Sequence, residues 1–228
     1  MDRATWLKQM RQDCEQQYDT RFAPLYGEKL GLYDNAAHRQ FLDDFLDLLP
    51  PGSALLDAAC GAGRYLHFLL ERGHAVLGID QSTGMLGRAR DKYPAVRFEK
   101  VGLQEMDHRA AFDGVICMDA MENIAPEDWL LVLGNFQRAL KPDGLLYFTA
   151  ETIENADEAR IRQAFERARK AGLPVVYGEW PDEVVYHFHP SNSRAGAWTR
   201  QAGFQVLKEG NGSGYFHLLA RKPASPAK

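Results

Sequence analysis

The chain has 228 residues, of which 45% are hydrophobic and 25% are charged, and its formal net charge is −4. This composition is typical of a folded globular protein and excludes a disordered chain, while the acidic balance argues against nucleic acid as a partner. No stretch approaches the roughly 18 apolar residues of a membrane span, and the polar first residues are unlike a secretory signal, so we expect a cytoplasmic protein without a membrane partner.

The cysteines are odd in number, at Cys14, Cys60 and Cys117, and no two have the C-x-x-C spacing. A disulfide framework or a zinc site is therefore not expected. We predict that all three are small buried packing residues in a reducing compartment.

Residues 1–50 predict a helical N-terminal cap. Trp6 and Met10 share one helical face in the segment 4–14, and a second apolar stripe runs through 38–49. The aromatic segment between them is interrupted by proline and glycine, which predicts a loop or a broken helix.

From residue 51 onward, short apolar runs alternate with helical patterns, which predicts a parallel sheet covered by helices on both faces. The expected strands are 53–59, 74–80, 96–101, 112–118 and 145–150, and the expected helices are 64–73, 82–94 and 126–140. Ser82 is the expected N-cap of the second of these helices.

The alternation breaks after Ala150. There we expect a charged helix over 155–172, strands over 175–180 and 183–189, a helix over 191–203 and a hairpin over 204–222. The expected units are therefore a cap (1–50), a core (51–150 and 191–222) and an insertion (151–190) that covers the substrate.

A glycine turn follows the first strand of the core. That strand ends at Asp57, and Gly61 and Gly63 come next, so the backbone can approach a ligand there without a Cβ clash. The following helix offers free N–H groups at its start. A dinucleotide fingerprint needs a third glycine where this chain has Leu66, which argues against a nicotinamide cofactor.

Asp80 ends the second strand, 19 residues after Gly61. An acid at this place accepts hydrogen bonds from the hydroxyls of a ribose, so we expect a ligand that contains a nucleoside. Two alternatives stay open: Asp80 as a charge at a helix N-terminus, and Asp57 as a residue that only ties down the glycine turn.

Three segments carry a family resemblance. "LLDAACGAGRYLHFLLERGHAVLGID" resembles motif I and the acidic end of the second strand in class I S-adenosylmethionine-dependent methyltransferases. "FDGVICMDAMENI" resembles the fourth strand of that family, and "RALKPDGLLYFTA" resembles its fifth, with Asp143-Gly144 where two glycines are usual. The resemblance covers about residues 50–150. It implies a doubly wound, mostly parallel, seven-stranded Rossmann-like α/β sheet that ends in an antiparallel hairpin strand.

The resemblance also implies S-adenosyl-L-methionine as the cofactor. Backbone groups of the glycine turn would line its methionine part, Asp80 would hold the ribose, and Leu103 and Gln104 would contact the adenine, where the family often has an acid. We further expect Tyr18 and Tyr26 of the N-terminal segment to cover the methionine end, with ordinary helix packing as the alternative. The expected positions are Tyr18, Tyr26, Asp57, Ala59, Gly61, Gly63, Asp80, Gln81, Leu103, Gln104, Met118 and Asp119.

The candidate acceptor pocket draws on the tyrosines of the N-terminal loop, including Tyr33, and on the insertion. In an extended strand His187 and His189 share one face, with Tyr186 and Phe188 on the other. Our hypothesis is that the histidines face the cleft and that one of them acts as a base or substrate anchor.

Glu122 is a further catalytic candidate near the exit of the methyl group. The alternative for the histidines is a solvated edge. A metal site is not expected, because the isolated H-x-H has no evident third ligand.

These observations predict a methyltransferase that moves a methyl group by in-line displacement onto the oxygen or nitrogen of a small organic acceptor, with carbon or sulfur as further options, acting as a monomer or homodimer. A non-catalytic S-adenosylmethionine binder and a nicotinamide oxidoreductase remain alternatives. Methylation of RNA or protein is a further alternative. The acidic charge disfavours RNA, and Met118-Asp119-Ala120-Met121 disfavours an exocyclic base nitrogen, for which an Asn-Pro-Pro-Tyr type of loop is expected. The aromatic content of the cap favours a small enclosed acceptor over a protein.

Overall fold

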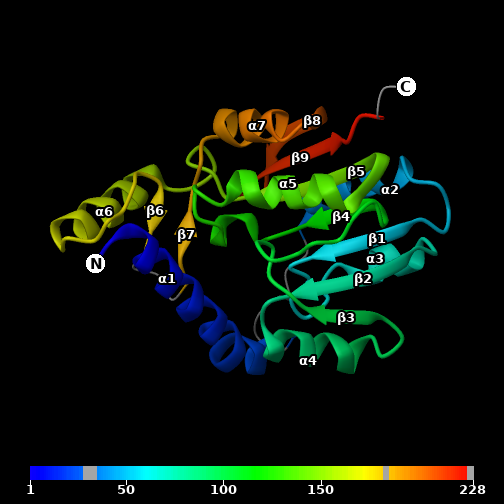
Figure 1. The fold of residues 1–228 in the computed structure, drawn as a ribbon, viewed down its shortest axis with the longest axis horizontal. Coiled ribbons are helices and arrows are strands. Elements are labelled where there is room, and N and C mark those ends of the chain that lie inside the picture. Colours follow the sequence, from blue (N-terminus) through cyan, green and yellow to red (C-terminus); the bar gives the residue numbers. More distant parts are fainter. Residues whose placement is uncertain (28–34, 182–184, 225–228) are drawn as a thin grey trace.

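The computed structural model describes residues 1–27, 35–181 and 185–224, so Tyr33 and part of the strand expected over 183–189 lie outside it. A seven-stranded sheet with the order β3-β2-β1-β4-β5-β9-β8 forms its centre (Figure 1). Its strands are β1 (Ala54–Ala58), β2 (Ala75–Asp80), β3 (Arg97–Lys100), β4 (Phe112–Cys117), β5 (Leu140–Ala150), β8 (Gln205–Gly212) and β9 (Tyr215–Arg221). The helices are α1 (Arg3–Gln17), α2 (Ala36–Asp47), α3 (Leu66–Glu71), α4 (Thr83–Lys92), α5 (Trp129–Ala139), α6 (Glu158–Lys170) and α7 (Asn192–Gln201).

The pairing confirms the predicted fold class. β1 to β5 are parallel, and β9 runs antiparallel to both β5 and β8. One boundary differs, because β5 already begins at Leu140, within the stretch expected as helix and turn. The register against β4 shifts between Phe112 and Gly114, and Asp143 has a φ of 62°, so the expected turn is an irregularity inside the strand.

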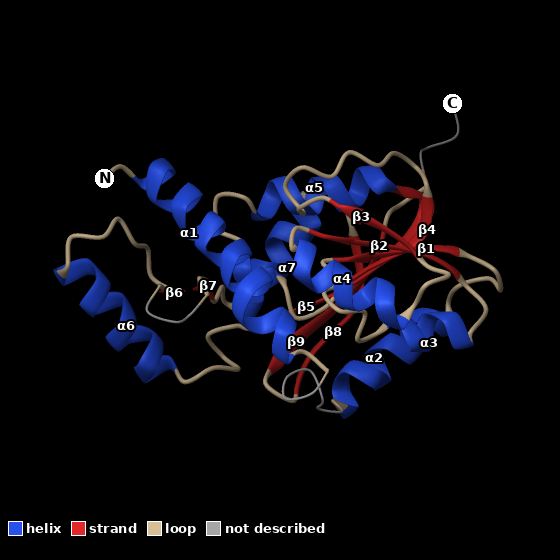
Figure 2. Cartoon of the chain, turned by 90° about the horizontal axis from the view of Figure 1, so that it is seen from below, coloured by secondary structure: helices blue, strands red, loops and turns tan. Residues whose placement is uncertain are grey.

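Side chains along the strands alternate between the two faces, each of which packs on helices. On one face Leu55 and Tyr147 join a cluster with Phe45 of α2 and Leu66 of α3. On the other face β1, β4, β5 and β9 pack against α5, whose Trp129 is fully buried. Figure 2 shows α5 and the α2–α3 pair on opposite sides of the sheet. Although α2 falls within the expected cap, it packs on the sheet.

The N-terminal segment lies across the carboxyl ends of the strands, from the β6–β7 hairpin to α4 (Figure 1). After α1 it continues as a π-helical turn η1 (Tyr18–Phe22) and a 3-10 turn η2 (Ala23–Leu25). Asp19 accepts hydrogen bonds from Ser82 Oγ at 2.6 Å and from the N–H of Gly84 at 2.8 Å, which ties this segment to the start of α4. Ser82 is the N-cap of α4, as predicted.

The insertion contains less strand than expected. β6 (Glu179–Trp180) and β7 (His187–Phe188) pair through two residue pairs only. Cys14, Cys60 and Cys117 are free and buried. Among the described residues, no helix is long and apolar enough to cross a membrane.

Candidate functional site

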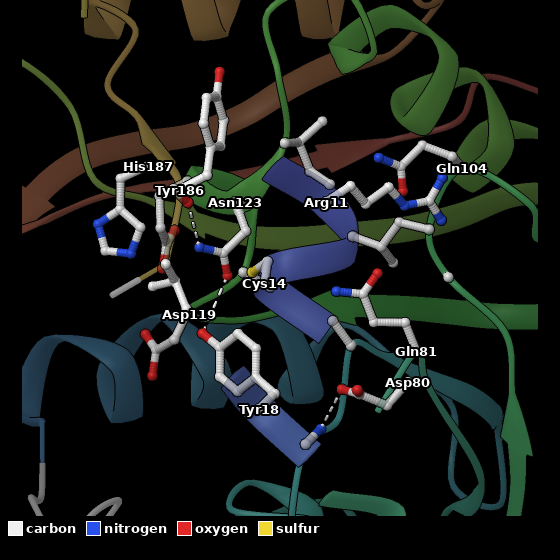
Figure 3. A pocket seen from close by; sticks show the side chains of 18 of the residues that line it. Arg11, Cys14, Tyr18, Asp80, Gln81, Gln104, Asp119, Asn123, Tyr186 and His187 are labelled. Atoms are coloured by element: carbon white, nitrogen blue, oxygen red, sulfur yellow. Dashed lines mark hydrogen bonds between the residues drawn. The ribbon is translucent and has the colours of Figure 1, made fainter. Parts of the chain in front are cut away.

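A cavity of about 1200 Å³ lies between the carboxyl ends of the strands and the inner side of α1 (Figure 3). Most of the residues singled out in the sequence line it. These are Tyr18, Tyr26, Asp57, Ala59, Gly61, Asp80, Gln81, Leu103, Gln104, Met118, Asp119, Glu122 and His187. Gly63 and His189 are not part of the lining.

Asp80 organises the glycine turn. Its Oδ2 accepts the N–H of Gly61 and its Oδ1 accepts the N–H of Ser82, both at 2.8 Å. The sequence left open that Asp57 only ties down the glycine turn. In the structure, Asp80 makes the hydrogen bonds that hold this turn. Burial raises the pKa of Asp80 to about 6, which leaves the carboxyl ionised at neutral pH and able to accept further hydrogen bonds from the cavity.

A glycine is required at position 63 because neighbouring side chains leave no room for a Cβ, and not because the backbone has to approach a ligand in the cavity. Its φ is 77°, and a Cβ there would lie 2.8 Å from Leu66 Cδ1 and 3.0 Å from Tyr93 Cε2. Gly61, with a φ of 54°, does line the cavity. The sequence pattern treats the two glycines alike because it does not show what stands behind each of them.

Asp57 is a buried acid with unused hydrogen-bonding capacity. The residue is 2% exposed, and its Oδ2 has no hydrogen-bond partner within the described ranges. Burial, and secondarily the charge of Asp80, raises the pKa of Asp57 to about 7. A buried acceptor of this kind beside a cavity fits a ligand that brings a donor or a positive charge.

Asp119 is the centre of a hydrogen-bonded network. Its Oδ1 lies 2.7 Å from His38 Nε2, and its Oδ2 accepts from Arg64 Nη1 at 2.7 Å and from Tyr65 OH at 2.8 Å. Burial raises the pKa of Asp119. The hydrogen bond and charge of His38 and the charge of Arg64 lower it by more, so the net shift is downward. Asp119 thus orients Arg64, which also donates to Tyr26 OH.

Arg64 lines the cavity and was not identified from the sequence. The sequence signal that could have identified Arg64 is a basic residue directly after the second glycine, at the start of the helical pattern. Its distant partners, Tyr26 and Asp119, come from the N-terminal segment and from the loop after β4, so local sequence does not reveal the network.

The opposite end of the cavity is framed by the loop after β3. Asn135 of α5 donates to the carbonyl oxygens of Leu103 at 2.8 Å and Gln104 at 3.1 Å, which holds this loop in place. Arg11 of α1 lies beside Gln104 at the same end (Figure 3) and makes an ion pair with Glu105.

Glu122 is a buried acid in the wall of the cavity. It is 4% exposed, and among the described residues its Oε2 has no hydrogen-bond partner. Burial, followed by the charges of Glu151 and Asp119, raises its pKa well above the usual range. The neighbouring Asn123 accepts from Tyr18 OH at 3.2 Å and donates to the carbonyl of Tyr186 at 3.0 Å, which links η1 to the insertion.

The two histidines of the insertion lie against Glu151. His187 Nδ1 is 3.4 Å and His189 Nε2 is 3.1 Å from Glu151 Oε2. His187 lines the cavity, whereas His189 is 2% exposed, so they do not form a solvated edge. Tyr186 and Phe188 are buried in the core cluster.

Glu151 was missed in the sequence, although an acid that directly follows the fifth strand is a usable signal. Burial raises its pKa, but the hydrogen bonds and charges of the two histidines outweigh burial and bring it to about 2.

Comparisons with known proteins agree with this geometry. Residues 55–144 match a family model described as a methyltransferase domain. A malonyl-[acyl-carrier protein] O-methyltransferase of Salmonella typhimurium (strain LT2) is 29% identical over 172 residues, covering 72% of this chain and 65% of the relative. A ubiquinone biosynthesis O-methyltransferase of Pseudomonas paraeruginosa (strain PA7) is 26% identical over 171 residues, covering 68% and 66%. The chain thus spans just under two thirds of the length of these relatives.

A solved structure has the same fold. The Burkholderia thailandensis 1,6-didemethyltoxoflavin-N1-methyltransferase, with bound 1,6-didemethyltoxoflavin and S-adenosylhomocysteine, aligns with a TM-score of 0.69 at 20% identity, covering 98% of this chain and 91% of that one. The glycine turn and the acid that ends β2 lie within the matched residues, as do the strands β2, β3 and β4 of the sheet. Residues 55–144 are therefore a methyltransferase domain, and the chain has the fold of the class I S-adenosylmethionine-dependent methyltransferases.

Proposed function

We propose that the chain transfers a methyl group from S-adenosylmethionine to the oxygen or nitrogen of a small organic acceptor, with carbon or sulfur as further options. The observation that carries this proposal is that one cavity of about 1200 Å³ contains both the Asp80 end and the His187 end. Pockets for one small ligand measure roughly 300–1000 Å³, so this volume suits a cofactor and an acceptor side by side.

The residues at the sheet end of the cavity fit the cofactor. Asp80 accepts from the ribose hydroxyls, and Gln81, Leu103 and Gln104 surround the adenine. Ala59 and Gly61 line the methionine part through their backbone.

Two charged side chains, Asp57 and Arg64, fit the charged groups of the methionine part. The carboxyl of Asp57 faces its positive charge, and Arg64, held by Asp119, faces its carboxylate. Met118 packs beside the amine, and the tyrosines of the N-terminal segment cover this end.

When bound, the cofactor supplies an electrophilic methyl group on a positively charged sulfur. The chain has to hold the acceptor atom in line, about 3–3.5 Å from the methyl carbon, and to exclude water. We assign exclusion of water to α1 with Tyr18, and positioning of the acceptor to Glu122 and the His187–Glu151 pair. An acceptor that begins protonated gives up its proton at this end of the cavity.

The names of the relatives favour oxygen as the acceptor atom, and the ligand of the Burkholderia structure supports a small acceptor. The Salmonella and Pseudomonas proteins are both named as O-methyltransferases, and the Burkholderia structure holds a small heterocycle. The buried Glu122 and the aromatic side chains of α1 and η1 support an enclosed acceptor, because a protein substrate docked on an open surface would not need them. The acidic balance supports the absence of a nucleic-acid partner.

The test is to incubate the chain with methyl-labelled S-adenosylmethionine and a small-metabolite extract, and to identify by mass spectrometry the molecule that gains one methyl group. We expect a labelled product with the wild type and none with Asp80→Asn at a cofactor concentration that saturates only the wild type. Tight cofactor binding without a labelled product would favour the non-catalytic binder, and retention of a nicotinamide dinucleotide would favour the oxidoreductase.

We further propose a cytoplasmic protein that acts as a monomer or homodimer. The three free, buried cysteines support a reducing compartment. Light scattering of the purified chain measures the oligomeric state, and a stable higher oligomer would contradict this proposal.

A further inference from the structure

We propose that Glu151, His187 and His189 bind one divalent transition-metal ion, with Zn²⁺ as the probe, at the acceptor end of the cavity. This inference rests on the proposed function and deepens it, since it names the group that holds the acceptor. The third ligand that the H-x-H pattern lacks in the sequence is supplied by the residue that directly follows β5.

The three side chains converge at metal-ligand spacing. One ligand atom of each lies within 4.8 Å of the others. Glu151 Oε2 is 3.4 Å from His187 Nδ1 and 3.1 Å from His189 Nε2. Ligand atoms bound about 2.0–2.2 Å from a tetrahedral zinc ion lie about 3.3–3.6 Å apart, so the two Glu151–histidine distances fit an ion after adjustments of a few tenths of an ångström.

The orientation of His189 supports metal binding. Its Nδ1 lies 3.2 Å from the carbonyl oxygen of Gly178, to which it donates. This hydrogen bond turns the Nε2 toward Glu151, and metal-binding histidines are usually oriented by such a bond from the other ring nitrogen. A single carboxylate oxygen then faces two imidazole nitrogens, and one cation between them satisfies all three groups.

The site has an open side. Glu151 and His187 line the cavity, while His189 is buried behind them. Two histidines and a carboxylate with a free coordination position are the ligand set of catalytic zinc and of non-haem iron. The free position faces the volume that we assign to the acceptor.

This placement selects an acceptor class. A phenol or an enol whose oxygen binds the ion loses its proton to water more readily, because the ion stabilises the resulting anion. The oxygen then forms a bond to the methyl carbon, and the carbon–sulfur bond breaks with its electron pair remaining on sulfur. No oxidant or reductant is needed.

The test uses the full chain, freed of metal by a chelator and titrated with Zn²⁺ by calorimetry and with Co²⁺ by visible absorption, in the absence of cofactor. We expect one ion per chain in the wild type and at least about tenfold weaker binding in Glu151→Gln and in His187→Gln. His108→Gln is the matched control, because His108 pairs with Glu99 at 3.2 Å and does not line the cavity. It should bind the ion like the wild type.

Two results would overturn the proposal. One is a wild-type chain that does not bind one ion per chain, and the other is an ion affinity that is the same in Glu151→Gln, His187→Gln and His108→Gln. Undiminished methyl transfer by metal-free protein would overturn the role assigned to the ion. Calorimetry with S-adenosylmethionine on the same variants measures cofactor binding separately from metal binding. Normal metal binding without any methyl product would refute the proposed function and leave the metal site standing, so the two failures are distinguishable.

Discussion

At the scale of single residues, Asp80 carries the largest share of the proposed cofactor site. Its carboxylate already holds two backbone N–H groups and offers its remaining lone pairs to the cavity. We expect Asp80→Asn to weaken the binding of S-adenosylmethionine by about 1–3 kcal/mol, because charge-assisted hydrogen bonds to the ribose are lost. Calorimetry measures the change, with Asp91→Asn on the exposed side of α4 as the control. Unchanged affinity would contradict the ribose assignment.

Asp57 makes the stability of the cofactor-free chain depend on pH. Its pKa rises from 3.8 to about 7, mainly through burial, so the folded chain holds this proton more tightly than the unfolded chain does. The linked stability is complete below about pH 4 and is lost as the pH rises through about 7. Between about pH 5 and pH 8, Asp57→Asn should gain on the order of 2 kcal/mol in free energy of unfolding relative to the wild type.

Urea unfolding at both pH values measures this difference, with Asp91→Asn again as the control. A difference between Asp57→Asn and the wild type that stays constant with pH would contradict a buried proton on Asp57.

The residues that sequence reasoning identified are those whose signal is local. Asp80 and Gly61 stand at the ends of apolar strands, and Ser82 precedes a helical pattern. Arg64 and Glu151 were missed because their partners are distant in the chain. Arg64 meets Asp119 across 55 residues, and Glu151 meets His189 across 38. Only the assembled sheet brings such groups together.

At the scale of elements, α1 acts as a cover held by ion pairs with the core. Arg11 pairs with Glu105, and Lys100 of β3 pairs with Glu15 at 2.7 Å. Each exposed pair contributes about 1 kcal/mol or less and adds to the apolar packing of Trp6, which is buried in the core cluster.

We predict that Arg11→Glu speeds the dissociation of S-adenosylmethionine by about two- to tenfold, since like charges then repel at the mouth of the cavity. Adding Glu105→Arg should restore the wild-type rate. Stopped-flow fluorescence measures dissociation, and Arg72→Glu, which breaks an exposed pair with Asp47 away from the cavity, is the matched control. If the double variant is no slower than the single one, the cover is not held by this pair.

Elements were predictable where periodicity is strong, and boundaries were not. The five parallel strands and the helices of the core follow from apolar runs and caps. The insertion was overestimated as strand, because its apolar residues, such as Phe188, contact the core cluster and not a broad sheet. The early start of β5 depends on a left-handed residue, Asp143, which no period reveals.

At the scale of the whole molecule, the cavity is lined by parts of the chain that are far apart in the sequence. Its lining comes from α1, the glycine turn, the loops after β3 and β4, and the insertion. A ligand held there bridges the N-terminal segment to the sheet. Binding therefore stabilises the cover more than it stabilises the sheet, whose own core is already packed on both faces.

Hydrogen exchange tests this difference in response. With S-adenosylhomocysteine in large excess over its Kd, we expect amide exchange in α1 and in the turn after β1 to slow by at least about tenfold. α2 is the internal control, because it packs on the sheet and contributes nothing to the cavity lining. Its exchange should change much less. Asp80→Asn at the same ligand concentration should show less protection of α1 than the wild type does, in proportion to its weaker binding. Equal protection of α1 and α2 in the wild type would mean that the ligand stabilises the fold as one unit, and α1 would then not be a separate cover.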